Sequence, residues 1–205
     1  MPDLSEQLRQ LLQGRVCFMG LGNVDYADDG FGVRLAEELK SEGRGPKAER
    51  SPKSEGRSEG SEESSASSSS DLWYRPSFGH RISAFGLQSH VIVAGTTPDR
   101  LIGQVADAGF DHLIFLDAVD FGGPAGSVVL LNSDEMAARY PQISTHRISL
   151  GLLAKWAEAN GTTKAWLLGV QPESLKPGDE LTPTVRAALE LVLELVRDVS
   201  MEVLA

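Results

Sequence analysis

The alternation of apolar and polar positions along this chain predicts a series of strands and helices. Short apolar runs indicate strands, and apolar residues at i, i+3 and i+4 spacing indicate helices with one buried face. The run at 112–116 is continuously apolar, as is typical of a strand buried on both faces. The predicted strands are 16–19, 90–93, 112–116, 128–131 and 165–170, with an edge strand at 81–87; the predicted helices are 29–40, 98–108, 149–160 and 182–199, with a short helix or turn at 133–140 and an amphipathic helix within 1–15.

This alternation also predicts the class of fold. Helices between successive strands favour a three-layer α/β/α sandwich around a mostly parallel central sheet. The last helix carries a start signal, because Thr182 suits the N-cap and Pro183 suits the first helical position. We therefore expect one α/β domain over residues 1–205.

One segment interrupts the pattern. Residues 41–71 contain no Val, Ile, Leu, Met or aromatic residue. Such a stretch buries too little apolar surface to offset its ordering entropy, so we predict a disordered low-complexity insertion within the single domain. A docking or phosphorylation segment is the functional alternative.

Composition narrows the class of partner. The formal net charge is −10, which disfavours nucleic acid and anionic membrane surfaces as partners. A single cysteine, Cys17, allows no internal disulfide and fits a reducing compartment. The first 15 residues lack the features of a signal peptide, and no apolar run approaches the roughly 20 residues that span a bilayer. We therefore predict a cytoplasmic protein.

A glycine-rich turn follows the first strand. Gly20 and Gly22 resemble the start of a dinucleotide fingerprint, but the third glycine of that motif would fall at Asp25. An acid at this position repels a pyrophosphate, so a nucleotide-binding function is disfavoured. The glycines are better interpreted as residues that allow a tight turn.

Three acids and a histidine are the candidates for chemistry. Asp28 and Asp29 begin the first predicted helix, where either could cap the helix or face a ligand. Asp117 ends the strand 112–116, and ligands of open α/β sheets bind at the carboxyl ends of strands. His146 lies in a loop before a helix. Carboxylates with an imidazole suit a borderline divalent metal such as zinc or nickel, although sequence spacing does not show that these residues converge. Cys17 is a weak nucleophile candidate because it lies in an apolar strand.

Four motifs in order along the chain resemble those of a known family. They are Gly20-Leu-Gly-Asn with Asp28-Asp29-Gly-Phe-Gly-Val-Arg, Leu113-Ile-Phe-Leu-Asp117-Ala-Val, Ser144-Thr-His146, and Gly169-Val-Gln-Pro-Glu173-Ser with Leu181-Thr-Pro. This series is similar to the signature motifs of the NiFe-hydrogenase maturation endopeptidases.

The resemblance implies an activity, a site and a partner. Members of this family have an α/β/α fold and remove a C-terminal peptide from the precursor of the hydrogenase large subunit after nickel insertion. Matched residue by residue, the metal-contacting and catalytic residues are Asp29, Asp117 and His146, which leaves Asp28 as the helix cap. The resemblance further implies that the nickel is recognised in the substrate and is not a permanent cofactor.

The chain also departs from the family pattern. Family members commonly carry Asp-Gly-Gly-Thr after the second strand, and here Val93 replaces the Asp of that motif. This replacement favours an alternative function, in which a non-catalytic relative inspects nickel loading and binds the precursor without cutting it.

The predicted insertion leads to a test of stability. Deletion of residues 43–70 should leave the thermal unfolding midpoint nearly unchanged, because the segment has no Val, Ile, Leu, Met or aromatic side chain with which to pack. Differential scanning calorimetry of the full chain and the deletion variant measures this. A fall of more than about 10 °C would show that the segment packs on the domain, since roughly 1 kcal/mol shifts the midpoint of a domain of this size by 2–4 °C.

Overall fold

The structure is a computed structural model that describes residues 3–42, 89–139, 149–159 and 161–204. The predicted edge strand at 81–87 and nearly all of the insertion predicted at 41–71 lie outside these ranges. The edge strand, the disorder of the insertion and the single domain over residues 1–205 therefore stay predictions.

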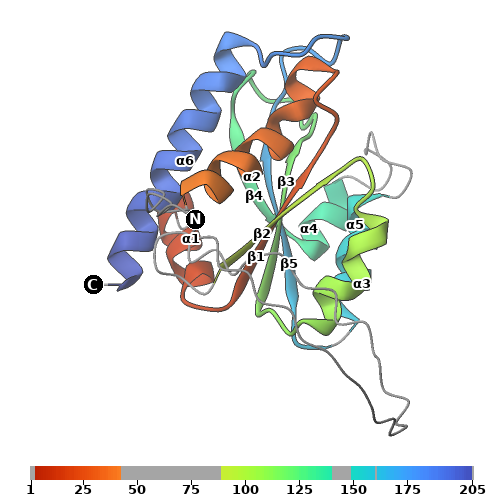
Figure 1. Cartoon of the computed structure of the whole chain (residues 1–205), viewed down its shortest axis with the longest axis vertical. Coiled ribbons are helices and arrows are strands. Elements are labelled where there is room, and N and C mark those ends of the chain that lie inside the picture. The colour runs from red at the N-terminus through yellow and green to blue at the C-terminus, as the bar shows by residue number, and fades with distance from the viewer. Residues whose placement is uncertain (1–2, 43–88, 140–148, 160, 205) are drawn as a thin grey trace, which may run out of the picture.

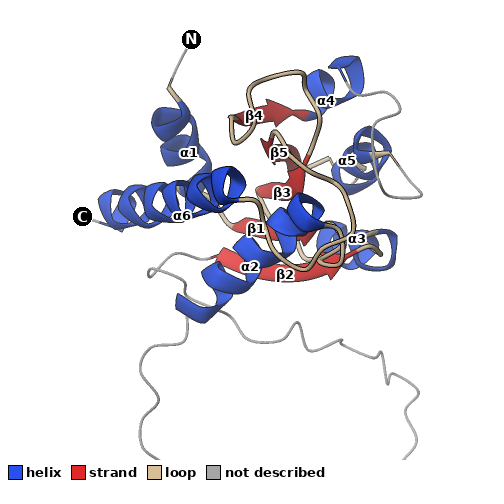
Figure 2. Cartoon of the chain, turned by 90° about the horizontal axis from the view of Figure 1, so that it is seen from above, coloured by secondary structure: helices blue, strands red, loops and turns tan. Residues whose placement is uncertain are grey.

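A five-stranded sheet in the order β2-β1-β3-β5-β4 forms the centre of the fold (Figure 2). β1 pairs in parallel with β2 and with β3, and β3 pairs in parallel with β5. Only the edge strand β4 is antiparallel, to β5. This arrangement confirms the predicted mostly parallel sheet. The strands are β1 (Val16–Leu21), β2 (Ser89–Gly95), β3 (His112–Ala118), β4 (Val128–Asn132) and β5 (Lys164–Val170).

Helices cover both faces of the sheet, which confirms the predicted three layers (Figures 1 and 2). One face carries α1 (Leu4–Leu12), α2 (Phe31–Glu42) and α6 (Pro183–Leu204). The other face carries α3 (Asp99–Asp107), α4 (Ser133–Arg139) and α5 (Leu150–Glu158). Among the helices of the described ranges, none combines the length and the apolar character needed to cross a bilayer.

Alternation along β1 divides the core between these two layers. Val16 and Phe18 pack in the cluster shared with α1, α2 and α6, whereas Cys17 and Met19 pack in the cluster shared with α3, α4 and α5. All six residues of β1 are buried. β1 therefore needs apolar side chains on both of its faces, which is why its sequence is a continuous apolar run.

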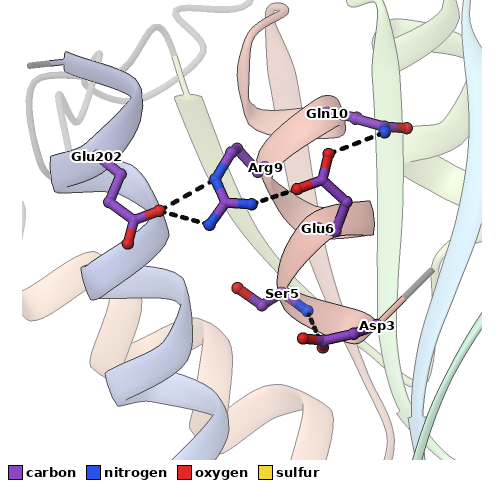
Figure 3. Close-up of polar contacts among 6 residues, drawn as sticks. All are labelled: Asp3, Ser5, Glu6, Arg9, Gln10 and Glu202. Carbon is purple, nitrogen blue, oxygen red and sulfur yellow. Dashed lines mark hydrogen bonds and ion pairs between the residues drawn. The ribbon is translucent and has the colours of Figure 1, made fainter.

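The N-terminal helix docks on the last helix (Figure 3). Leu8, Leu11 and Leu12 of α1 are buried in the core cluster that also contains residues of α6. At the surface of this contact, the Arg9 guanidinium donates to the Glu202 carboxylate, with N···O distances of 3.0 and 2.6 Å. Exposed ion pairs contribute little free energy, so the buried leucines hold α1 in place and Arg9 sets its alignment.

The helix predicted at 29–40 is α2, and it starts later than predicted. Ala27–Gly30 form a 3-10 turn, η1, and α2 begins only at Phe31. The Asp29 N–H bonds to the Tyr26 carbonyl, three residues back, and the backbone N–H groups of Ala27 and Asp28 donate to Gly178 and Ser174 in the loop that follows β5. These bonds hold η1 in a tighter turn than an α-helix.

Glycines allow the N-terminus of α2 to approach the sheet closely. A Cβ on Gly32 would lie 1.9 Å from the Leu116 carbonyl oxygen of β3, and a Cβ on Gly20 would lie 2.4 Å from the Gly32 carbonyl oxygen. Gly20 is thus a packing glycine inside β1, not the turn residue that the sequence predicts. Gly22, with φ of +114°, does form the predicted turn. The backbone contact at Gly32 fixes η1 against the ends of β1 and β3.

Substitution of this packing glycine should destabilise the fold. Gly32→Ala should lower the free energy of unfolding by about 3 kcal/mol or more, because its Cβ would clash with backbone and not with a movable side chain. Gly103→Ala in α3 is the matched control. A Cβ there would meet nothing within 4 Å, so the substitution should raise the free energy of unfolding by about 0.5–1 kcal/mol. Urea unfolding measures both, and a loss for Gly32→Ala no larger than that for other helix substitutions would contradict the close contact.

Candidate functional site

The candidate site lies at the carboxyl edge of the sheet, where β1 and β3 end side by side. The chain leaving β1 passes through η1 and α2 toward β2, and the chain leaving β3 turns the other way, toward β4. Ligands of open α/β proteins bind where neighbouring parallel strands diverge in this manner. The topology therefore brings the residues that follow β1 and β3 to the position at which such proteins bind ligands.

Asp29 presents a carboxylate oxygen without a partner at this edge. Its side chain belongs to η1 and is 4 % exposed. One oxygen, Oδ2, accepts a hydrogen bond from the backbone N–H of Asn23 at 2.7 Å. The other, Oδ1, is buried and has no hydrogen-bond partner among the described residues. Since an unpartnered buried oxygen is costly, Asp29 Oδ1 is a candidate ligand atom.

Asp117 lies on the neighbouring strand. The sequence places it after a strand that ends at Leu116, but the structure continues β3 to Ala118, because pairing with β5 extends to Val170. The Asp117 side chain is buried, and its Oδ1 accepts from the backbone N–H of Ala118 at 2.9 Å. Because η1 packs against β3, the structure brings the elements that carry Asp29 and Asp117 together.

The third predicted residue, His146, lies outside the described residues. Within the ranges that the structure does describe, no three His, Cys, Asp or Glu side chains are placed to hold a metal ion. The ligand set Asp29, Asp117 and His146 therefore stays a prediction. Its oxygen and nitrogen donors suit nickel or zinc.

Asp28 has a different role from the helix cap that the sequence predicts. The interpretation as a cap is wrong, because the Asp28 side chain accepts no bond from its own turn. Its carboxylate instead accepts four hydrogen bonds from the loop after β5 and from the start of α6. Oδ2 accepts from the N–H groups of Glu173 and Ser174 at 2.9 Å each, and from the Thr182 hydroxyl at 3.0 Å; Oδ1 accepts from the Thr182 N–H at 2.7 Å.

Gln171 is a further structural residue at this edge that the sequence did not single out. Its Oε1 accepts from the N–H groups of Phe121 and Gly123, and its Nε2 donates to the Asp120 carboxylate at 3.0 Å. The hydrogen bond from Gln171 lowers the pKa of the Asp120 carboxyl. Gln171 belongs to the Gly169–Ser174 motif, so the signal was present, but nothing in the sequence indicated its partners.

Two other candidates are resolved by the structure. Cys17 is fully buried, and burial raises the pKa of its thiol, so the thiolate that a nucleophile requires is disfavoured. Val93 lies on the edge strand β2 opposite Gly20 and is 37 % exposed. It is therefore on the far side of β1 from Asp117.

The fold and the carboxylates define an open α/β/α protein with three buried aspartates, Asp28, Asp29 and Asp117, where β1 and β3 diverge. Comparison with known proteins identifies the family. The sequence profile of the hydrogenase maturation protease family matches residues 80–199, more than half of the chain. The chain therefore belongs to the hydrogenase maturation protease family and is a peptidase.

Individual relatives agree with this assignment. The hydrogenase 2 maturation protease of Escherichia coli is 27% identical over 186 residues, which cover 89% of this chain and 88% of the relative. The solved structure of the hydrogenase maturating endopeptidase HybD from E. coli is also 27% identical, with a TM-score of 0.59 and 89% of each chain covered. The structure of the maturation protease HycI from Thermococcus kodakarensis has a TM-score of 0.65 and covers 96% of this chain and 99% of that one; its 22% identity supports the fold alone.

The two adjacent acids should respond oppositely to substitution. Asp28→Asn should lower the free energy of unfolding by about 2–3 kcal/mol, because it removes charge-assisted hydrogen bonds that a buried carboxylate accepts from part-buried N–H groups. Asp29→Asn should raise it by about 1 kcal/mol, since it replaces a buried carboxylate that has one unpartnered oxygen with a neutral amide. Chemical unfolding of both variants measures this, and equal losses would contradict the division of roles.

Proposed function

We propose that this peptidase removes a C-terminal peptide from the precursor of a NiFe-hydrogenase large subunit after nickel has been inserted. In this proposal Asp29, Asp117 and His146 contact the nickel held by the precursor, and the metal is part of the substrate. The cytoplasm is the proposed compartment.

The observation that carries the proposal is the free carboxylate oxygen of Asp29. The turn that holds Asp29 is fixed by backbone bonds and by the Asn23 N–H, so the carboxylate has a defined position before a ligand binds. A preorganised ligand loses little entropy when it binds. Asp117 on the adjacent strand would supply a second hard oxygen donor, and His146 a nitrogen donor.

This arrangement also supports selectivity for loaded precursor. Contact with a nickel ion would satisfy the Asp29 oxygen, whereas a precursor without nickel would leave that oxygen buried and unpaired. Sites with unsatisfied buried polar groups reject partners that lack the matching group. The metal contact would also hold the C-terminal extension near the reacting groups, and such positioning can contribute several kcal/mol.

The non-cleaving alternative has less support. It rests on Val93, which lies on β2, away from Asp117 and outside the proposed ligand set. The relatives named above are proteases, which supports cleavage.

Mass spectrometry of the precursor tests the proposal. The full chain should release a short C-terminal peptide from nickel-loaded precursor and leave nickel-free precursor intact. Asp29→Asn and His146→Ala should each slow release by about 100-fold or more, because the metal contact that positions the substrate is lost.

Asp25→Asn serves as the matched control, because Asp25 is an exposed acid in the same loop. This variant should process the precursor like the unsubstituted chain. A stable complex with nickel-loaded precursor that never loses mass would overturn the proposal, and equal cleavage of nickel-free precursor would overturn the role of nickel.

A further inference from the structure

We infer that the loop after β5, residues 171–182, acts as a clamp that sets the positions of Asp29 and Asp117 relative to each other. Two positioning residues hold this loop: Asp28, which lies in η1, and Gln171, which lies in the loop itself. The inference rests on the proposed function in that it gives these two residues a role in presenting the substrate-binding carboxylates. Neither positioning residue itself contacts the substrate.

The first anchor of the clamp fixes the Asp29 turn. The Asp28 carboxylate receives the N–H groups of Glu173 and Ser174, and the Asp28 N–H donates back to the Ser174 carbonyl at 3.1 Å. One residue earlier, Ala27 donates to the Gly178 carbonyl at 2.6 Å. Ala27 has a φ of +42°, a strained conformation for a residue other than glycine. The hydrogen bonds to the loop stabilise this strained conformation of Ala27. They therefore also fix the position of Asp29, two residues further on.

The second anchor fixes the segment that follows Asp117. Gln171 Oε1 accepts from the N–H groups of Phe121 and Gly123 at 2.9 and 3.2 Å. The Gln171 N–H also donates to the Ser127 carbonyl at 2.8 Å. The side chain is only 7 % exposed, so water does not readily replace these bonds. Gln171 thereby fixes the segment at 121–123, just after β3 ends at Ala118, one residue beyond Asp117.

The two anchors are separated by a single residue, Pro172. The proline ring fixes φ, so this short connection is stiff. A displacement at one anchor is therefore transmitted to the other. At its far end the loop is held by the core, because Leu181 is 5 % exposed in the cluster under α6 and Thr182 bonds to Asp28. The clamp thus joins the Asp29 turn, the exit of β3 and α6.

Amide hydrogen exchange tests the transmission directly and does not depend on activity. Asp28→Asn should raise exchange about tenfold at residues 121–123, which Asp28 does not bond, and Gln171→Leu should do the same at 27–29. Asp111→Asn is the control. It removes an acceptor of a backbone N–H, that of Arg15 at 2.7 Å, at the opposite edge of the sheet, and should change neither segment. Exchange that rises only beside each substituted residue would overturn the clamp.

Single-turnover cleavage of nickel-loaded precursor with excess enzyme tests the consequence. Misplaced carboxylates should lower the plateau rate constant by about tenfold or more in Asp28→Asn and in Gln171→Leu. A loss of folded enzyme alone would change only the enzyme concentration that gives half the plateau. Asp111→Asn should keep the plateau.

The outcomes separate this inference from the proposed function. If the unsubstituted chain fails to cleave but the reciprocal exchange is seen, the proposed function is wrong and the clamp stands. The clamp is overturned if the unsubstituted chain cleaves and either variant keeps the normal plateau rate constant while its hydrogen exchange rises only beside the substituted residue. Two variants at separate anchors keep the test decisive if one of them does not fold.

Discussion

The carboxyl edge of the sheet depends on one buried carboxylate, that of Asp28. It is fully buried and accepts backbone N–H groups 145, 146 and 154 residues away in the sequence. Charge-assisted hydrogen bonds to a carboxylate are stronger than those between neutral groups, and removal of this acceptor leaves several part-buried donors without a partner. This side chain joins the turn after β1 to the loop after β5 and to the start of α6, so the geometry of the site rests on it.

Asp29, the neighbouring acid, is in contrast only partly hydrogen-bonded. Asp29 has one oxygen bonded and one without a partner in the described part of the chain. Both oxygens of Asp28 accept hydrogen bonds, whereas Oδ1 of Asp29 accepts none within the described residues. The unpaired Oδ1 carries a free-energy cost. Costs of this kind are tolerated where function requires them. Two adjacent residues of one type thus divide the structural work and the recognition of the ligand.

Much of the fold could be predicted from sequence, because its elements follow from local periodicity. Every predicted strand within the described residues is present, and Thr182 does cap α6, where its hydroxyl accepts from the Val185 N–H. The predicted start of α2 was wrong because the Asp29 N–H bonds only three residues back, to Tyr26, in a 3-10 turn that is also bonded to the loop after β5. Asp117 lies inside β3 because pairing with β5 continues past the apolar run.

The site was harder to derive than the fold. Spacing alone left Asp28 and Asp29 interchangeable, because the partners of Asp28 are mostly backbone groups, which have no sequence signature. The role of Gln171 could not be predicted for the same reason, since its Oε1 accepts from the backbone N–H groups of Phe121 and Gly123. The family resemblance selected Asp29 with Asp117 and His146. The free Asp29 oxygen is an independent observation that supports the same selection for Asp29.

The central claim is that Asp29 provides a ligand to nickel carried by the substrate. Nickel K-edge X-ray absorption of loaded precursor, alone and frozen rapidly in complex with the full chain, measures this contact. The account predicts added oxygen or nitrogen ligands at nickel in the complex, and fewer of them with Asp29→Asn. A nickel spectrum that is identical in free precursor and in a fully formed complex would contradict it.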